Sequence, residues 1–388
     1  MPLLFRVTTV PISLQKLISG QLPFMKLHGL EPVMISAEGP EVEEVIEEQG
    51  CPHIAISLTR KISPLKDLIG LWQFYKLCRQ YRPAIIHSHT PKAGLIGMLG
   101  GKLAGVPVRL HTVAGLPLME YQGIERYVLE WVEKITYASA TKVYPNSANL
   151  KEFILASRFC DEGKLKVIGN GSSNGIDTRF FSMAALEDQR LEHLKAQLQV
   201  DKEDFLFVFI GRLVKDKGIQ ELVEAFITLQ KSFSKIKLLL VGPLEEDLDP
   251  LSKKTLRHME ENPAILTVGY QKDVRPYLAI SKALVFPSYR EGFPNVPMQA
   301  GCFDLPCIAT DINGCNEIII EGKNGLLVPP KTTQELLEAM QKLLVDPELY
   351  SQLRKNARRM IVERYEQTHI WKLLLEEYQG QIGKLLHV

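Results

Sequence analysis

The chain lacks the cysteine spacings of a metal site or of a disulfide framework. Its six cysteines are scattered over 388 residues, with no C-x-x-C pair and no His/Cys cluster at zinc spacing. We interpret them as buried thiols of a protein in a reducing cytosol. We expect neither a bound metal nor another cofactor.

The chain also lacks an excess of charge and any long apolar run. Its 46 basic and 45 acidic side chains nearly cancel, so no general field attracts nucleic acid. No run of about 18 apolar residues is present, and the start "MPLLFRVTTVP" does not resemble a signal peptide. We therefore expect a cytoplasmic protein that neither binds nucleic acid nor spans a membrane.

Short apolar segments alternate with segments of helical period, which predicts an α/β protein with parallel sheets. The first series of strand candidates is "LLFRVTTV", "PVMISA", "AIIHSH", "PVRLHTV" and "TKVYPN". After the charged segment 183–203 a second series follows: "DFLFVFIGR", "KIKLLLVG", "AILTVGY", "ALVFPS", "LPCIATD" and "GLLVPP". We expect two doubly wound, Rossmann-like domains facing a cleft, with ligands beyond the carboxyl ends of the strands.

The charged segment suggests domains at 1–185 and 186–365, with a C-terminal helix at 366–388 that caps the second domain or returns to the first. A further helix is expected at 65–82, where basic residues accompany an apolar set. We interpret it as packed into the core with a solvated basic edge, and contact with a membrane surface is the alternative. Its apolar set is Leu65, Leu68, Ile69, Trp72 and Tyr75.

Two strand–loop–helix segments carry residues suited to a nucleotide-sugar. In "FVFIGRLVKDKGI" a strand ends at Gly211, and Arg212 and Lys217 stand beside a helix start, which suits a diphosphate; a solvated basic loop is the alternative. In "ALVFPSYREGFPNVPMQA" Glu291 precedes a helix whose free N–H groups would point into the same crevice. Its carboxylate can accept hydrogen bonds from sugar hydroxyls.

These segments, together with "PCIATDINGCNEIIIEGKNGLLVPP", closely resemble the retaining glycosyltransferases of family 4, which have the GT-B architecture. The nearest subgroup builds bacterial capsule, exopolysaccharide and lipid-linked glycans. In the first half, "IIHSHTPKAGLIGMLGGKLAGVPVRLHTVAGLP" is similar to the same subgroup. The resemblance covers nearly the whole chain.

The resemblance implies roles for individual residues of the second domain. Arg212 and Lys217 match the pair that holds the donor diphosphate and stabilises the leaving group, and Glu291 matches the acid near the transferred sugar. Gln299 stands where the family usually has a second Glu that bonds the ribose; an amide can still bond two hydroxyls but lacks the charge. The remaining donor-site positions are Gly211, Gly292, Phe293, Pro294 and Asn295.

The first domain offers weaker candidates. His111 matches a histidine that the family places near the sugar, and a structural role is the alternative. The loop "TTVPISLQKLISG" lacks the glycine pair of many relatives, which leaves Ser13 as an acceptor-side candidate together with His89 and Lys92. The sequence "DLD" at 247–249 mimics a metal-binding motif, but we interpret it as a solvated turn.

The expected reaction transfers a sugar, with retention, from a nucleoside diphosphate sugar, with UDP as the favoured nucleotide, to a hydroxyl of a glycan or a polyprenyl-diphosphate-linked acceptor. Two cations take the place of a metal. The resemblance also implies peripheral contact with the inner membrane leaflet. Two alternatives stay open: a nucleotide-sugar epimerase of the same architecture, and a non-catalytic nucleotide-sugar-binding subunit. A NAD-dependent enzyme is disfavoured because no G-x-G-x-x-G follows the first strand.

Overall fold

The computed structural model describes residues 1–59, 63–116, 123–245, 247 and 249–386. The chain forms two compact units: Met1–Gly175 together with Gln367–Val388, and Ile176–Glu366. The second unit begins at Ile176, before the boundary expected at residue 186, because the segment that follows already packs on it. The Arg358 guanidinium donates to the carbonyl of Thr178 at 2.7 Å and to that of Phe181 at 3.1 Å.

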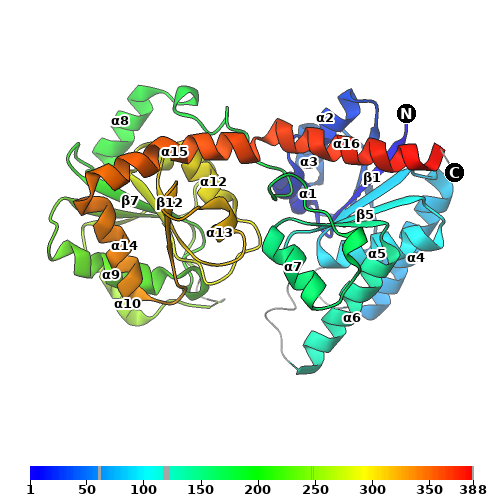
Figure 1. Ribbon diagram of the computed structural model, residues 1–388, viewed down its shortest axis with the longest axis horizontal. Coiled ribbons are helices and arrows are strands. Elements are labelled where there is room, and N and C mark those ends of the chain that lie inside the picture. Colours follow the sequence, from blue (N-terminus) through cyan, green and yellow to red (C-terminus); the bar gives the residue numbers. More distant parts are fainter. Residues whose placement is uncertain (60–62, 117–122, 246, 248, 387–388) are drawn as a thin grey trace. The chain divides into compact units, whose positions relative to one another are not determined.

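The first unit has a sheet of six parallel strands in the order β3-β2-β1-β4-β5-β6. Its apolar segments are buried on both faces, as strands between helical layers require. The strands are β1 Leu3–Val7, β2 Glu31–Ser36, β3 His53–Ala55, β4 Ile85–His89, β5 Val108–Val113 and β6 Lys142–Pro145. Its α-helices are α1 Pro11–Ile18, α2 Gln21–Leu27, α3 Val42–Gln49, α4 Pro64–Tyr81, α5 Pro91–Leu103, α6 Gly123–Ser139, α7 Ala148–Ala156 and α16 Gln367–Leu386, and η2 is a short 3₁₀ turn at Glu162–Lys164. Figure 1 shows α2 and α16 on one side of this sheet and α5 and α6 on the other.

The second unit repeats this plan with the order β12-β11-β10-β7-β8-β9. Its strands are β7 Phe205–Ile210, β8 Ile236–Val241, β9 Ile265–Thr267, β10 Ala283–Phe286, β11 Cys307–Thr310 and β12 Gly325–Val328. Its helices are η3 Met183–Ala185, α8 Asp188–Gln197, η4 Lys215–Lys217, α9 Ile219–Gln230, α10 Lys253–Glu261, α11 Arg275–Ala279, α12 Asn295–Cys302, α13 Cys315–Ile318, α14 Thr333–Val345 and α15 Pro347–Tyr365. The expected α/β class with two doubly wound parallel sheets is confirmed.

In each sheet the winding direction changes once. The change lies between β1 and β4 in the first unit and between β7 and β10 in the second. Loops that follow the two strands at such a point diverge to opposite faces and leave room for a ligand beyond the carboxyl ends. The topology therefore identifies the carboxyl edge at this change as the candidate ligand site of each unit.

The last helix, α16, packs within the first unit. Its Leu374, Leu375 and Tyr378 are buried in one cluster with Leu4 of β1 and Ile85 of β4. Burying large apolar side chains removes about 1.5–3 kcal/mol of unfavourable hydration each, which explains why this segment packs against the first sheet.

The expectation that helix 65–82 buries its apolar set is wrong for four of its residues. The buried face of α4 is formed by Gly70, Phe74 and Cys78. At Gly70 an added Cβ would lie 2.4 Å from the Ser57 carbonyl oxygen, so this face touches backbone closely. The exposed residues are Leu65, Leu68, Ile69 and Trp72. Within the described residues no helix is both long and apolar enough to cross a bilayer.

Candidate functional site

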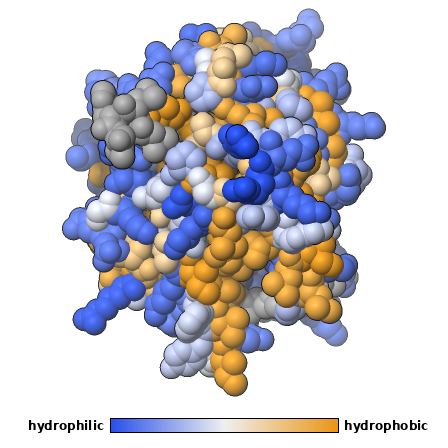
Figure 2. Space-filling model, turned by 90° about the vertical axis from the view of Figure 1, so that its right-hand side faces the viewer, coloured by the Kyte–Doolittle hydropathy of each residue, from blue (hydrophilic) through white to orange (hydrophobic). Residues whose placement is uncertain are grey.

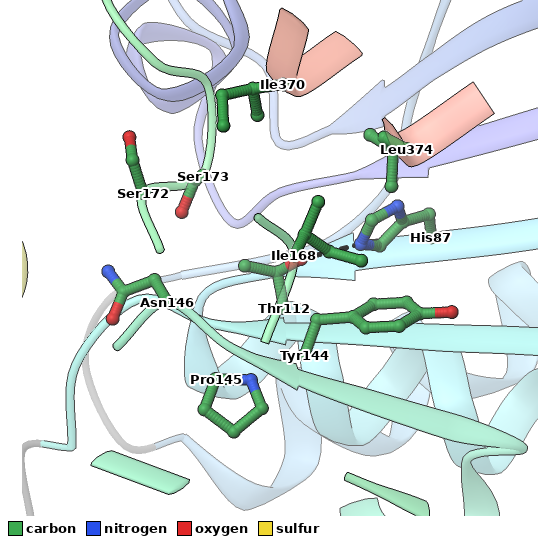
Figure 3. Close-up of a pocket in the computed structure, with 10 residues that line it drawn as sticks. All are labelled: His87, Thr112, Tyr144, Pro145, Asn146, Ile168, Ser172, Ser173, Ile370 and Leu374. Carbon is green, nitrogen blue, oxygen red and sulfur yellow. Dashed lines mark hydrogen bonds between the residues drawn. The ribbon is translucent and has the colours of Figure 1, made fainter. Parts of the chain in front are cut away.

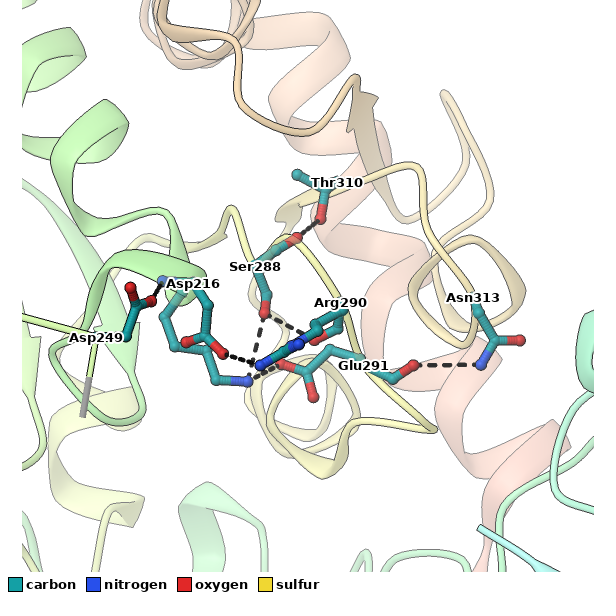
Figure 4. Close-up of polar contacts among 8 residues, drawn as sticks. Asp216, Asp249, Ser288, Arg290, Glu291, Thr310 and Asn313 are labelled. Atoms are coloured by element: carbon teal, nitrogen blue, oxygen red, sulfur yellow. Dashed lines mark hydrogen bonds and ion pairs between the residues drawn. The ribbon is translucent and has the colours of Figure 1, made fainter. Parts of the chain in front are cut away.

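The loops that follow β7 and β10 meet at the winding change of the second sheet. There the Lys217 ammonium lies 2.5 Å from Glu291 Oε1, and it also donates to Ser288 Oγ at 3.4 Å. Figure 4 shows Glu291 and Ser288 converging beside the start of a helix. The side chains of Lys217 and Glu291 are 17% and 16% exposed, so the pair is largely shielded yet reachable from solvent. The sequence placed these two residues 74 positions apart, and the topology brings them together.

The Lys217 loop is held by backbone contacts. The amide of Asp216 donates to the Asp249 carboxylate at 2.6 Å, and the Asp216 carbonyl accepts from the Tyr289 amide at 2.8 Å. Gly218 has φ 70°, and a Cβ there would meet the Pro287 carbonyl oxygen at 2.1 Å, so only glycine fits where α9 begins. Asp249, expected in a solvated turn, is indeed exposed, and in addition it fixes this loop.

The Glu291 loop is fixed from the opposite side by the segment before α13. The Asn313 amide donates to the Gly292 carbonyl at 2.6 Å and to that of Glu291 at 3.3 Å (Figure 4). Gly314, with φ 77°, lies so close to Gly292 that a Cβ would approach its carbonyl oxygen to 2.4 Å. Asn313 and the close approach of Gly314 therefore fix the backbone of the Glu291 loop. None of these contacts uses the carboxylate oxygens of Glu291.

The helix that follows, α12, begins with the N–H groups of Asn295 and Val296, which have no partner inside the helix. Its N-cap is Pro294, which makes no side-chain capping bond, and Asn295 at its first position is exposed. The first N–H groups of a helix carry partial positive charge and bind anions. Gln299 is half-buried on the same helix, and Phe293 packs edge-to-face on Tyr365 with ring centroids 5.5 Å apart.

Arg212 lies on the same loop as Lys217 but has a different partner. It follows Gly211 at the end of β7, and its guanidinium bonds Glu245 at 2.9 Å instead of Glu291. The Arg212 side chain is 44% exposed, so it keeps the freedom to turn toward a bound anion. The two expected cations thus share one loop, and each is paired with a carboxylate.

The corresponding edge of the first unit carries hydroxyl groups. Thr9 Oγ1 and Thr90 Oγ1, which follow β1 and β4, lie 2.8 Å apart. Thr90 has φ 73° and ψ 144°, a conformation that costs about 1–3 kcal/mol and concentrates at functional sites. Ser13 lies half-buried on α1, and Lys92 in the first turn of α5 pairs with Asp67 at 2.8 Å.

His111 is buried below this edge. Its Nδ1 lies 2.9 Å from Ser88 Oγ, and a Cβ on Gly94 of α5 would meet its ring at 2.4 Å. Burial lowers the pKa of His111 to about 4, so the ring is neutral at pH 7. These contacts hold the imidazole as a packed polar group, and its role near a sugar stays a prediction.

His87 and His89 face the same side of β4, as two residues in alternation must, and their rings stack with centroids 4.8 Å apart. Both bond the buried Arg6: Arg6 lies 2.5 Å from His87 Nδ1 and 2.7 Å from His89 Nε2. Tyr378 of α16 also contacts Arg6, and its hydroxyl lies 2.5 Å from His87 Nδ1. His89 therefore belongs to a polar cluster that ties α16 to the sheet.

This cluster was not predicted from the sequence. Arg6 is fully buried, and it also donates to Gln21 Oε1 at 2.7 Å. Burial lowers the pKa of His87 and of His89 well below the usual value, which leaves them neutral and able to accept from the guanidinium. An arginine inside an otherwise apolar strand, "LLFRV", was the available signal.

A small pocket in the first unit lies between the ends of β5 and β6 and the last helix (Figure 3). Its polar wall includes His87, Thr112 and Asn146, and its apolar wall includes Ile370 and Leu374. The acceptor-side candidates Ser13, His89 and Lys92 do not line it. Among the residues that the structure describes, no group of three His, Cys, Asp or Glu side chains could hold a metal ion.

Comparison with known proteins agrees with this geometry. The pattern of the family described as "Glycosyl transferases group 1" matches residues 191–360, and that of the "Glycosyl transferase 4-like domain" matches residues 25–171. The Staphylococcus aureus capsular polysaccharide biosynthesis glycosyltransferase CapM is 31% identical over 375 residues, which span 97% of this chain and 96% of CapM. An Escherichia coli UDP-Gal:alpha-D-GlcNAc-diphosphoundecaprenol alpha-1,3-galactosyltransferase is 26% identical over 335 residues, or 86% of this chain and 84% of that protein.

Solved structures show the same fold at lower identity. A glycosyltransferase from Rickettsia africae superposes with a TM-score of 0.81 at 20% identity and covers 98% of each chain. Anabaena Alr3699/HepE in complex with UDP superposes with a TM-score of 0.80 at 17% identity, covering 98% of this chain and 100% of that one. The expected GT-B architecture is therefore confirmed. The two family matches and the similarity to CapM along nearly the whole chain agree with the two sheets and the cation–carboxylate loops. The chain belongs to the group 1 family of glycosyltransferases.

Proposed function

We propose that this protein is a retaining glycosyltransferase that moves a sugar from a UDP-sugar to a hydroxyl of a lipid-linked glycan in bacterial surface polysaccharide synthesis. Two relatives and one structural neighbour support this proposal. CapM is named for capsule biosynthesis, the Escherichia coli relative for UDP-Gal and a diphosphoundecaprenol acceptor, and HepE was crystallised with UDP.

The observation that carries the proposal is the ion pair of Lys217 and Glu291 beside the start of α12. A departing UDP develops negative charge on its diphosphate, so groups that favour the leaving state more than the ground state accelerate the reaction. Lys217, Arg212 and the first N–H groups of α12 supply positive charge on adjoining loops. Glu291 then orients the sugar through its hydroxyls and stabilises the positive charge at its anomeric carbon.

In the reaction that we propose, the acceptor oxygen attacks the face of the sugar from which the diphosphate leaves. The bond between the anomeric carbon and the phosphate oxygen breaks with its electron pair going to the diphosphate, and the acceptor hydroxyl gives its proton to that oxygen. The configuration is thereby retained without a covalent enzyme intermediate. Two cationic side chains take the electrostatic role that a divalent ion has in other transferases.

The donor half of this proposal is tested by nucleotide binding. Purified protein is screened by thermal shift against UDP, GDP and ADP and their sugars, because a ligand that binds only the folded state raises the melting temperature. UDP and one or more UDP-sugars are expected to stabilise the protein, and Lys217→Ala is expected to abolish most of the shift. Lys254→Ala is the matched control. Lys254 of α10 forms an exposed ion pair with Glu224 of α9, so the variant also removes a paired lysine. A response to GDP or ADP alone would contradict the UDP assignment.

Transfer itself is tested with the UDP-sugar identified in this way and an extract of lipid-linked acceptors, in buffer with and without EDTA. A product with the donor's anomeric configuration, formed equally in EDTA, is the expected result. Conversion of the UDP-sugar to an isomer without acceptor would identify an epimerase. UDP binding with no transfer to any acceptor extract would instead indicate a binding subunit.

A further inference from the structure

Two helices of the first unit expose the same apolar pattern. On α4 the residues at i, i+3, i+4 and i+7 are Leu65, Leu68, Ile69 and Trp72, and on α6 they are Ile124, Tyr127, Val128 and Trp131. Such spacing puts each set on one face of its helix. All eight side chains are between 50% and 82% exposed. We call these eight residues the outer apolar face.

A surface of this kind is unusual, because large contiguous apolar patches normally mark an interaction site. In Figure 2, hydrophobic side chains gather on the lower part of the face turned to the viewer. Each helix has a separate buried face, with Phe74 and Cys78 on α4 and Thr136 and Tyr137 on α6. The outer apolar face is therefore not needed to hold the helices on the sheet.

The two helices point their first turns to the same edge of the sheet. Each connects two parallel strands and so runs back from the carboxyl edge to the amino edge. Helix α5 packs against both α4 and α6. At the carboxyl edge, Lys92 of α5 pairs with Asp67 of α4 at 2.8 Å. Since the apolar residues occupy the first half of each helix, the outer apolar face lies beside the edge that holds Thr9 and Thr90.

Positive charge continues the apolar stripe of α4. Lys76 and Arg79 follow Trp72 on the same face and are exposed, and Lys76 Nζ lies 3.4 Å from the centroid of the Trp72 ring. Lys102 at the end of α5 and Lys134 of α6 are exposed as well. Of the three acids of α6, Glu133 is buried, Glu130 pairs with Arg126 at 2.9 Å, and Glu125 is exposed beside Ile124, off the stripe by helical spacing. The whole chain has a net charge of only +1, so this positive charge is local.

Aliphatic side chains flanked by tryptophan, tyrosine and lysine are the composition that helices use to lie in the interface of a bilayer. The apolar residues alone would also suit a protein partner. The cations that follow Trp72 on α4, Lys76 and Arg79, favour an anionic surface instead. We propose that the outer apolar face inserts into the headgroup region of an anionic membrane, with Lys76 and Arg79 on the lipid phosphates. This inference rests on the proposed function, since a lipid-linked acceptor would then reach the carboxyl edge of the first sheet from the bilayer.

The proposal is tested by co-sedimentation with vesicles that contain neither donor nor acceptor. One set holds equal parts of phosphatidylglycerol and phosphatidylcholine, and the other holds phosphatidylcholine alone. The wild type is expected to bind the anionic vesicles more strongly. The double variants Trp72→Ser/Trp131→Ser and Lys76→Glu/Arg79→Glu are each expected to lower that binding by about tenfold or more. Leu27→Ser is the matched control, because Leu27 is 85% exposed on α2 of the same unit and should not affect binding.

Three results would overturn the proposal. The first is a wild type that binds neither kind of vesicle, and the second is binding that both double variants retain. The third is a self-associated wild type that the tryptophan variant converts to monomer in sedimentation velocity runs without vesicles, since a second copy would then be the occupant. Circular dichroism confirms that each variant is folded. Transfer to a detergent-solubilised acceptor reports separately on the proposed function, so loss of vesicle binding with retained transfer would refute the membrane surface alone.

Discussion

Replacing Glu291 by glutamine separates the two tasks that we assign to the pair with Lys217. The ammonium of Lys217 bonds the Glu291 carboxylate at 2.5 Å. A diphosphate that binds at Lys217 must share or displace this partner. The introduced amide would keep the shape of the side chain but remove the competing charge, so Glu291→Gln should not weaken UDP binding and should slow sugar transfer.

The structure sets the scale of both effects. The two side chains are 17% and 16% exposed, which makes the pair a partly screened one worth about 1 kcal/mol, and UDP should therefore bind with unchanged affinity or up to about fivefold more tightly. For the transfer step, a hydrogen bond to a charged group exceeds one to a neutral group by about 1–1.5 kcal/mol. If Glu291 accepts one or two sugar hydroxyls, the turnover number falls about ten- to hundredfold.

Calorimetry with UDP and steady-state kinetics at saturating UDP-sugar measure the two quantities. Glu245→Gln is the matched control, because it makes the same chemical change beside Arg212, where the ion pair is 2.9 Å long. That variant should leave the turnover number near the wild-type value. UDP binding weakened more than tenfold by Glu291→Gln would refute the reasoning, since the carboxylate would then contact the nucleotide rather than the sugar.

Three further predictions concern the cations of the second unit and the buried polar groups of the first. Arg212→Ala and Lys217→Ala should each lower turnover by about two to three orders of magnitude, and rates within a few-fold of wild type would contradict their leaving-group role. Tyr378→Phe should lower the free energy of unfolding of the first unit by about 1–3 kcal/mol in urea titrations, because it removes the hydroxyl that bonds buried Arg6. The lowered pKa of buried His111, about 4, means that the unfolded chain binds more protons between that value and about 6.5. Stability should accordingly fall as the pH drops through this window, and His111→Asn should flatten the fall.

Most strands could be predicted from the sequence because parallel strands between two helical layers are apolar on both faces. All six strands of the second sheet lie inside predicted segments, and in the first sheet the segments missed only β3, His53–Ala55. That strand has three residues, all partly exposed at the sheet edge, so it carries no continuous apolar run. The convergence of Lys217 and Glu291 followed from strand–loop–helix order and the resemblance together.

Other features depend on tertiary contacts that no local pattern specifies. The apolar set of α4 has helical period, but period alone does not say which face meets the sheet; Gly70 and Phe74 decide that. The burial of Arg6 likewise depends on four partners from distant parts of the chain, including Gln21 and Tyr378. The separate pairing of Arg212 with Glu245 was not foreseen, because Glu245 follows a different strand.

The two sheets have the same winding but differ in the chemistry of the corresponding edges. In the second unit the edge holds cations, Lys217 and Arg212, each paired with a carboxylate. In the first unit the edge holds the hydroxyls of Thr9 and Thr90, and the nearby Arg6 is enclosed among neutral side chains. A donor diphosphate needs positive charge, whereas an acceptor hydroxyl must stay neutral until it attacks. In the reaction that we propose, the same topology serves both substrates, with the donor at the edge of Lys217 and Arg212 and the acceptor at the edge of Thr9 and Thr90.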